Sequence, residues 1–506
     1  MSQLRKLAGE TVWYGLSSII GRVISFLLTP LYTSIFLLGE YGVVTELLAY
    51  AAFFNVIYMY GMETAYFRFA TKNQEKNQEY FNLCVSSIIA SSFLISASLI
   101  LLAEPIMSVL GYEGKEEIIY WIAAILAIDS IYALPFAKLR LEGKAKRFAF
   151  IRLANVLVAV SLNLFFLVFC DGVVNDRFLG EFKGLVSTVY TPDFNVKYVF
   201  LSNLLANCLF IVLLFPQFKA FRFTFNYARF KPLLIYGFPI MVIGIAGTTN
   251  EMLSRTLLKF ILPEGFYPSQ TNIEALGVFG ACYKLSVLMM LGTQAFRYAA
   301  EPFFFSKASQ SDSPELFSNV MKGFIIFNCL VFLGVTVNLE PLSIIFLRNP
   351  EYRDGLYIVP FLLMGYLFLG IYYNLSVWFK VTDKTKYGAM ITGLGTVITV
   401  VANLLLIPIL GYFGSALTTL VTYFFMAALS YYLGQKHYPI PYKVSNAVFY
   451  LLTASILSYL SYHIDFNSLF LNIIARNTSV ILFLLIIYLS ERKNLKVRKI
   501  LGIKLP

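Results

Sequence analysis

The sequence predicts an all-α integral membrane protein of about fourteen transmembrane helices, arranged as two pseudo-symmetric six-helix lobes and two C-terminal helices. Hydrophobic residues make up 58% of the 506 positions and charged residues only 13%, which excludes an ordinary soluble globule. Several apolar stretches, such as residues 85–103, 199–215 and 444–462, carry no charge. Because lipid cannot satisfy free backbone groups, each stretch long enough to cross is expected to be a helix.

The predicted spans follow one another with short connections. They lie at residues 9–37, 42–67, 83–103, 117–137, 149–170, 198–216, 233–261, 275–300, 319–339, 356–379, 387–408, 412–433, 444–463 and 469–490. Two longer connections are expected to be solvated connectors: an outer loop at 171–197 and a basic linker at 217–232.

The net charge of +12 follows the predicted topology. Lysine and arginine gather at 138–147, 219–231 and in the tail at 492–504, which all lie on the same side if the N-terminus is inside. This is the positive-inside bias, so both termini are predicted to be cytoplasmic and no nucleic-acid partner is expected. The basic tail alternates with apolar residues and is expected to lie on anionic membrane lipids.

A short LGxxG pattern occurs four times, at residues 38–42, 110–114, 276–280 and 410–414. We expect these glycines to form tight turns on the outer face, and the repetition indicates internal duplication. An offset of 238 residues relates the first copy to the third. The predicted divisions are therefore an N-lobe (1–220), a C-lobe (221–440) and a final pair of helices with the tail (441–506).

Several basic side chains lie within predicted spans, where charges are costly and usually line an interior site. Arg22 lies on a polar face of the first span with Ser18, Ser25 and Thr29. Arg255 and Lys259 share a face of the seventh span, and Lys284 lies in the eighth. We predict that Arg22, Arg255, Lys259 and Lys284 form a cationic cavity for an anion, and the planar arginine fork suits a phosphate group.

Three acids in the spans, Glu46, Asp129 and Glu251, are predicted to gate the cavity or to couple it to H⁺ or Na⁺. The 238-residue offset aligns Glu46 with Lys284, so these two are hypothesised to pair between the lobes.

Further charges lie nearer the predicted cytoplasmic ends of spans 2 and 8: Glu63, Arg68, Arg297 and Glu301. A simpler interpretation treats Glu251–Arg255 and Arg297–Glu301 as neighbours on one helix that neutralise each other.

No motif supports catalysis. The chain has no phosphate-binding GxxxxGK[ST] loop, and its two histidines, His437 and His463, lie at predicted span ends. The five cysteines lie in or next to spans and are expected to be small buried residues. We therefore predict no enzyme activity, no catalytic residue, no metal site and no cofactor beyond a coupling ion.

Residues 21–50 and 60–70 resemble the polysaccharide transporters of the MOP exporter superfamily, which includes O-antigen flippases, and the count of fourteen spans in two six-helix lobes extends the resemblance over the whole chain. The resemblance rests on Arg22 and Pro30 in the first span, the LGEYG turn, and a G-x-E-x-A-x-x-R pattern that ends the second span. The last pattern comprises Gly61, Glu63, Ala65 and Arg68. Lipid II flippases and MATE drug exporters are relatives of this group.

The resemblance implies a flippase that moves an undecaprenyl-diphosphate-linked oligosaccharide across the bacterial inner membrane by alternating access of two lobes. It implies that Arg22 binds the diphosphate and that the last two spans form a groove for the lipid tail. Expected partners are the lipid-linked glycan, membrane lipids, and the glycan polymerase and glycosyltransferases of the pathway; the chain is expected to be a monomer. A lipid II flippase and a MATE-type cation-coupled drug exporter are the alternatives.

Overall fold

Every regular element in the described part of the chain is helical, and the all-α membrane fold is confirmed. The structure is a computed structural model that describes residues 15, 19–307, 313–466 and 468–495. Within these ranges, thirteen helices are long and apolar enough to cross a membrane. A shorter apolar helix spans Ile19–Ile35, and the rest of the predicted first span lies largely outside the described residues.

The chain divides into two compact units. Unit 1 comprises Met1–Ala281 and Thr392–Thr418, and unit 2 comprises Cys282–Ile391 and Thr419–Pro506. The divisions predicted at 220 and 440 concern internal duplication, which these units do not test, so they stay a prediction.

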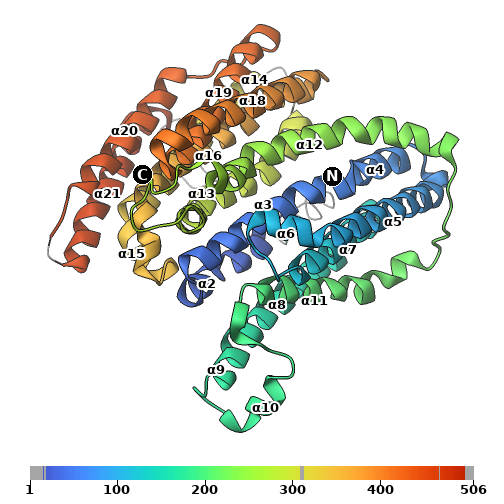
Figure 1. The fold of residues 1–506 in the computed structure, drawn as a ribbon. Helices are drawn as coiled ribbons and strands as arrows, with labels where there is room; N and C mark the ends of the chain where they lie inside the picture. The colour runs from blue at the N-terminus through green and yellow to red at the C-terminus, as the bar shows by residue number, and fades with distance from the viewer. Residues whose placement is uncertain (1–14, 16–18, 308–312, 467, 496–506) are drawn as a thin grey trace. The chain divides into compact units, whose positions relative to one another are not determined.

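Unit 1 holds the first half of the chain as a series of packed helices (Figure 1). They are α2 (Thr29–Ile35), α3 (Leu38–Met59), α4 (Met62–Lys72), α5 (Asn77–Leu101), α6 (Ala103–Leu110), α7 (Glu117–Leu141), α8 (Ala145–Leu164), α9 (Asp171–Val174), α10 (Lys183–Val186), α11 (Lys197–Leu214) and α12 (Tyr227–Ile261). A π-helical turn, Phe165–Cys170, joins α8 to α9. Short 3₁₀ turns occur at Gln74–Lys76, Gly180–Phe182, Pro192–Phe194 and Phe215–Phe218.

Unit 2 contains the later helices (Figure 1). They are α14 (Ser313–Val337), α15 (Leu339–Phe346), α16 (Val359–Leu375), α17 (Val377–Val381), α20 (Val444–Tyr462) and α21 (Leu469–Leu495), with a 3₁₀ segment at Pro350–Ile358. Three helices cross from one unit to the other: α13 (Asn272–Lys307), α18 (Lys386–Leu410) and α19 (Tyr412–His437).

The second predicted span is broken in the middle of Leu38–Lys72. Tyr60 and Gly61 both have positive φ, at 28° and 79°, and they separate α3 from α4. A Cβ atom at Gly61 would overlap the carbonyl oxygen of Gly237 on α12. Glycine is therefore required at position 61 for two reasons, the left-handed backbone and the close approach of α12.

The four LGxxG copies have two different roles, and the prediction that all form turns is wrong for two of them. Gly111 and Gly411 have positive φ and do form turns. The copies at 38–42 and 276–280 instead lie in the first turns of α3 and α13 and bring these helices together. A Cβ atom at Gly42 would overlap the carbonyl oxygen of Ile273, and one at Gly277 would overlap that of Leu38. The duplicated motif thus packs against its own copy, because only glycine lets two helix backbones approach so closely.

Candidate functional site

Glu46 is the most deeply buried acid of unit 1 and the centre of a polar cluster. Its side chain on α3 has no exposed surface. Lys259, in the last turn of α12, places its Nζ 3.0 Å from Glu46 Oε2. The hydroxyl of Tyr112, which follows α6, donates a hydrogen bond of 2.5 Å to the same oxygen. Tyr50, one turn further along α3, donates a longer bond of 3.4 Å to Oε1.

Lys259 has partners for each of its three donors. Besides Glu46, its ammonium donates to the hydroxyl of Tyr112 at 3.0 Å and to the carbonyl oxygen of Leu110 at 2.6 Å. It also lies 4.2 Å from the centre of the Tyr112 ring. A buried charge pair is tolerated when its remaining donors and acceptors are satisfied in this way. We name Glu46, Tyr112 and Lys259 the Glu46 cluster.

Tyr112 takes part in the cluster as a neutral phenol. Burial is the main cause that raises the pKa of Tyr112 above its ordinary value, and the nearby Glu46 carboxylate is the second. The phenol therefore stays protonated, accepts a hydrogen bond from Lys259 and donates one to Glu46. These contacts join α3, the segment after α6, and α12 at a single point.

Glu46 pairs with Lys259 in unit 1, whereas its hypothesised pairing with Lys284, a residue of unit 2, stays a prediction. The sequence offset aligned two positions of a repeat, but the partner of Glu46 comes from the helix that packs against α3. Lys259, which was predicted to bind an anion, is thus engaged by a carboxylate. Lys284 is partly buried in unit 2.

Arg22 is exposed on the Ile19–Ile35 helix and forms no ion pair with any described residue of unit 1. Of the polar face predicted around it, Ser25 is also exposed and Thr29 is buried, whereas Ser18 lies outside the described residues. Arg22 therefore presents an accessible guanidinium on an apolar helix.

Two further residues of the predicted cavity lie on α12. Arg255 is partly buried, and Glu251 is partly buried one turn before it. In the described part of unit 1, no ion pair joins the two, so mutual neutralisation does not account for them. Beside them, Asn250 accepts a hydrogen bond from Thr399, and Ser254 donates one to Asn403.

Asp129 lies within a separate polar network of α7, α8 and α11. Asn207 donates a hydrogen bond of 2.9 Å to its carboxylate, and Asn155 donates one of 3.0 Å to Asn207. Arg152, on α8, stacks its guanidinium 4.5 Å from the centre of the Phe136 ring. The network therefore tethers Asp129 through an amide rather than through a direct ion pair.

The residues predicted near the ends of spans 2 and 8 have structural partners. Glu63 forms an ion pair with Arg140 of α7, and both side chains are about one-third exposed. The guanidinium of Arg68 lies 4.2 Å from the centre of the Tyr236 ring of α12. Ala65, which lies between Glu63 and Arg68 in the sequence, is fully buried. Arg297 lies 4.9 Å from the centre of the Tyr373 ring within unit 2, whereas the side chain of Glu301 lies outside the described residues.

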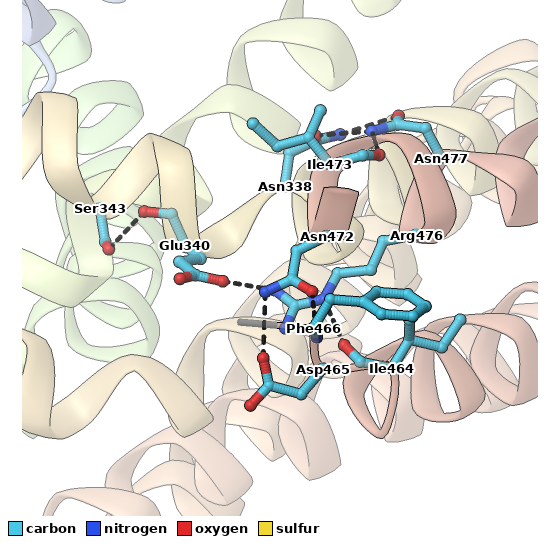
Figure 2. A network of polar contacts seen from close by, with 10 residues as sticks. All are labelled: Asn338, Glu340, Ser343, Ile464, Asp465, Phe466, Asn472, Ile473, Arg476 and Asn477. Carbon is cyan, nitrogen blue, oxygen red and sulfur yellow. Dashed lines mark hydrogen bonds and ion pairs between the residues drawn. The ribbon is translucent and has the colours of Figure 1, made fainter. Parts of the chain in front are cut away.

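Arg476, the arginine of the last described span, has an acidic partner in unit 2. Arg476 of α21 forms an ion pair of 2.7 Å with Glu340 at the start of α15 and donates to the carbonyl oxygen of Ile464 (Figure 2). Beside it, Asn338 and Asn477 exchange two hydrogen bonds between their side-chain amides (Figure 2). Arg476 therefore holds α21 against the start of α15.

Unit 2 also encloses a largely apolar cavity of about 340 Å³. It lies among α14, α16, α19 and α20, with Lys322, Tyr431 and Lys443 at its polar end. The cavity lies on the side of α20 that packs against α14, and the lipid groove that the resemblance implied for the last two spans stays a prediction.

Sequence reasoning missed Tyr112 and Arg140, the partners of two predicted acids. Tyr112 was assigned only to an interfacial turn, because a tyrosine in LGYEG is typical of a membrane boundary. Arg140 was counted within a cytoplasmic basic cluster. A tyrosine beside a turn glycine and a lysine at the end of a neighbouring span give no joint signal in sequence, since their contact depends on how the helices pack.

A family model described as a polysaccharide biosynthesis protein matches residues 21–174. Comparison with curated protein sequences finds no significant match. Among solved structures, the chain is similar to the lipid II flippase MurJ in an inward closed conformation, with a TM-score of 0.71 and 13% identity. The match covers 96% of this chain and 100% of that structure.

Drug transporters of the MATE type share the fold at lower similarity. An inward-facing multidrug resistance MATE family transporter of the MOP superfamily gives a TM-score of 0.57 at 13% identity, over 85% of this chain and 93% of that one. The Vibrio cholerae MATE transporter VcmN in its bent form gives 0.56 at 12% identity, over 89% and 100%. These matches agree with the predicted resemblance, and this chain is a multi-pass membrane protein with the fold that MurJ and the MATE transporters share.

Proposed function

We propose that this chain, which has the fold of the MOP exporter superfamily, is a flippase for an undecaprenyl-diphosphate-linked oligosaccharide. It works in the bacterial cytoplasmic membrane with both termini inside, and the oligosaccharide is a repeat unit of O-antigen, capsule or exopolysaccharide. The observation that carries the proposal is the pair of matches to different relatives. The polysaccharide biosynthesis model covers 21–174, and the structural similarity to a lipid flippase covers 96% of the chain.

Arg22 is the primary binding group for the diphosphate in this proposal. Its guanidinium is exposed on the Ile19–Ile35 helix, so it is accessible to a lipid headgroup. A planar guanidinium can bond two phosphate oxygens at once, which a lysine ammonium cannot reproduce. Arg255 and Lys284 serve as secondary basic groups, whereas Lys259 is reserved for Glu46.

The Glu46 cluster stabilises one conformation of the transport cycle. Lys259 belongs to the predicted C-lobe, and Glu46 and Tyr112 belong to the predicted N-lobe, so the cluster crosses the boundary that alternating access must open. Uptake of H⁺ by Glu46, or exchange of Lys259 for Na⁺ beside it, would weaken the ion pair. A ligand shifts such an equilibrium only through its different affinity for the two states.

The central test is display of surface glycan by a strain that depends on this chain. Arg22→Ala should abolish display while the protein remains at normal abundance in the membrane, and Arg22→Lys should restore it only in part. Ser25→Ala, an exposed neighbour that carries no charge, is the matched control and should display glycan normally. Normal display by Arg22→Ala would refute the binding role, and a normal strain after deletion of the whole chain would refute the flippase function.

A lipid II flippase is the second candidate, because the match to MurJ has the higher TM-score, 0.71 against 0.57 for the MATE transporter. The two candidates share the diphosphate and the polyprenyl chain and differ in the sugars. Reconstitution in vesicles with each lipid-linked glycan in turn distinguishes them, since only the true substrate should become accessible to an enzyme added outside. A glycan polymerase and glycosyltransferases are the proposed partners, and the chain is proposed to act as a monomer.

A further inference from the structure

The cavity of unit 2 combines an apolar body with a basic entrance. Its walls are mostly aliphatic and aromatic side chains of α14, α16, α19 and α20, including Ile325, Phe368 and Phe424. Its volume of about 340 Å³ is many times what one water molecule needs, and a cavity lined in this way does not hold water well. The body of the cavity therefore suits a hydrocarbon chain.

The polar end of the cavity lies where α20 begins. Lys443 immediately precedes α20, is exposed, and forms no ion pair with any described residue of unit 2. The N-terminus of α20 adds the positive end of a helix dipole beside it. Tyr431 and Tyr442, also at this end, are aromatic residues typical of a membrane boundary.

A second lysine at the same end is already neutralised. Lys322 of α14 forms an ion pair of 2.6 Å with Glu491 of α21, and Tyr450 of α20 donates a hydrogen bond of 3.0 Å to the same carboxylate. Tyr450 also shares a hydrogen bond with Ser490. These contacts fix the wall of the cavity and leave Lys443 as the cation that faces outward.

We propose that this cavity binds one chain of an anionic phospholipid, with the phosphate at Lys443 and the hydrocarbon between α14, α19 and α20. Two features support this occupant: a basic entrance and an apolar body. Basic pockets between membrane helices on the cytoplasmic side are typical sites for anionic lipid headgroups. The lipid would be a structural ligand of the helices around α20 and is distinct from the transported substrate of the proposed function.

The experiment is a lipid titration of the full-length protein in detergent, read by native mass spectrometry. Phosphatidylglycerol, phosphatidylcholine and undecaprenyl phosphate are the probes. We expect one tightly retained phosphatidylglycerol. Lys443→Gln should weaken its retention about fivefold, the change that corresponds to about 1 kcal/mol for one basic side chain near an anionic lipid. Phosphatidylcholine should be retained about as weakly by both proteins.

A second variant tests the apolar body. Ala428 lies on the cavity wall with an exposed side chain, so Ala428→Trp should fill the space and abolish retention. Ala90→Trp places the same side chain at an exposed position on α5 of unit 1 and should leave retention unchanged. Equal retention of phosphatidylglycerol by all variants would overturn the proposal. Preferential retention of undecaprenyl phosphate at Lys443 would also overturn it, while leaving the flippase proposal intact.

Discussion

The two ends of the Leu38–Lys72 span are held to the same helix, α12, by different physical means. At the Glu46 end, the contact is a buried charge cluster: Glu46 has no exposed surface and Lys259 is 16% exposed. At the Gly61 end, the contact is a close approach of two backbones, Gly61 to Gly237. The charges near it, Glu63 and Arg140, are 31% and 35% exposed.

This difference indicates how each end can open. A dry ion pair is expensive to break by removing one partner, because a charge is then left buried without compensation. A charged residue in a pair that is about one-third exposed can exchange its partner for water at little cost. The Gly61 end is therefore held to α12 mainly by the close approach of two backbones, and the Glu46 end mainly by a buried ion pair. The following changes should separate the two contributions.

The largest effect is expected at the Glu46 end. Lys259→Met should lower the free energy of unfolding by about 3–5 kcal/mol, because Glu46 is left buried beside an apolar side chain. Thermal unfolding of the purified protein in detergent measures the loss. The double variant Glu46→Gln/Lys259→Met should recover a large part of it, since the unpaired charge is gone. If Lys259→Met and the double variant Glu46→Gln/Lys259→Met were equally stable, the assignment of a dry ion pair would be contradicted.

A smaller effect is expected at the Gly61 end, where backbone shape is decisive. Gly265→Ala tests the left-handed backbone alone, because its φ is 72° and no atom lies within 4 Å of the added Cβ. It should cost about 1–2 kcal/mol. Gly61→Ala carries the same strain and also overlaps the backbone of Gly237, so it should cost more than Gly265→Ala. Thermal unfolding of both variants under identical conditions gives the comparison, and equal losses would show that α12 does not press on Gly61.

The exposed ion pair at the Gly61 end should matter less. Arg140→Gln removes the partner of Glu63, but the carboxylate is 31% exposed and can be hydrated. The expected loss is about 0–1 kcal/mol. A loss in thermal unfolding as large as that of Lys259→Met would mean that the two ends are equally dry.

A similarly small effect is expected from the cation–π contact of Arg68, which lies 4.2 Å from the Tyr236 ring centre. Arg68→Gln should lower stability by about 0.5–1 kcal/mol, because the guanidinium is exposed and already hydrated in part. Tyr236→Leu keeps an apolar side chain on α12 facing α4 and serves as the second arm. If the stacking is real, the double variant should lose less stability than the sum of the losses of the two single variants.

Much of the fold follows from the sequence, because a lipid environment leaves helices as the main choice for long apolar stretches. Residues 444–462 were predicted almost to the residue of α20, since no charge interrupts them and charged or polar positions bound them. The break at Tyr60 and Gly61 was not predicted, because one glycine in an apolar stretch is common and its need appears only when Gly237 lies opposite.

In the site, too, the sequence identified a residue whose importance is local but not the partner that helix packing brings to it. Glu46 was identified as important because an acid in a span demands a partner. Its partner was not identified, because the aligned repeat position suggested Lys284 and the contact with Lys259 arises from the crossing of α3 and α12. The G-x-E-x-A-x-x-R pattern was recognised as a family feature, and the structure supplies its reason: Gly61 and Arg68 face α12, and Glu63 faces α7.

Arg476 has a consequence for the biogenesis of the chain. An arginine within a membrane helix raises the cost of inserting it, by up to about 2.5–3.5 kcal/mol at the helix centre, so α21 is less favourable to insert alone. Its compensating carboxylate, Glu340, precedes it by 136 residues and is therefore synthesised first. The last helix can enter a membrane that already holds its counter-ion, and a ribosome that releases the chain in N-to-C order supplies these two residues in the order that insertion requires.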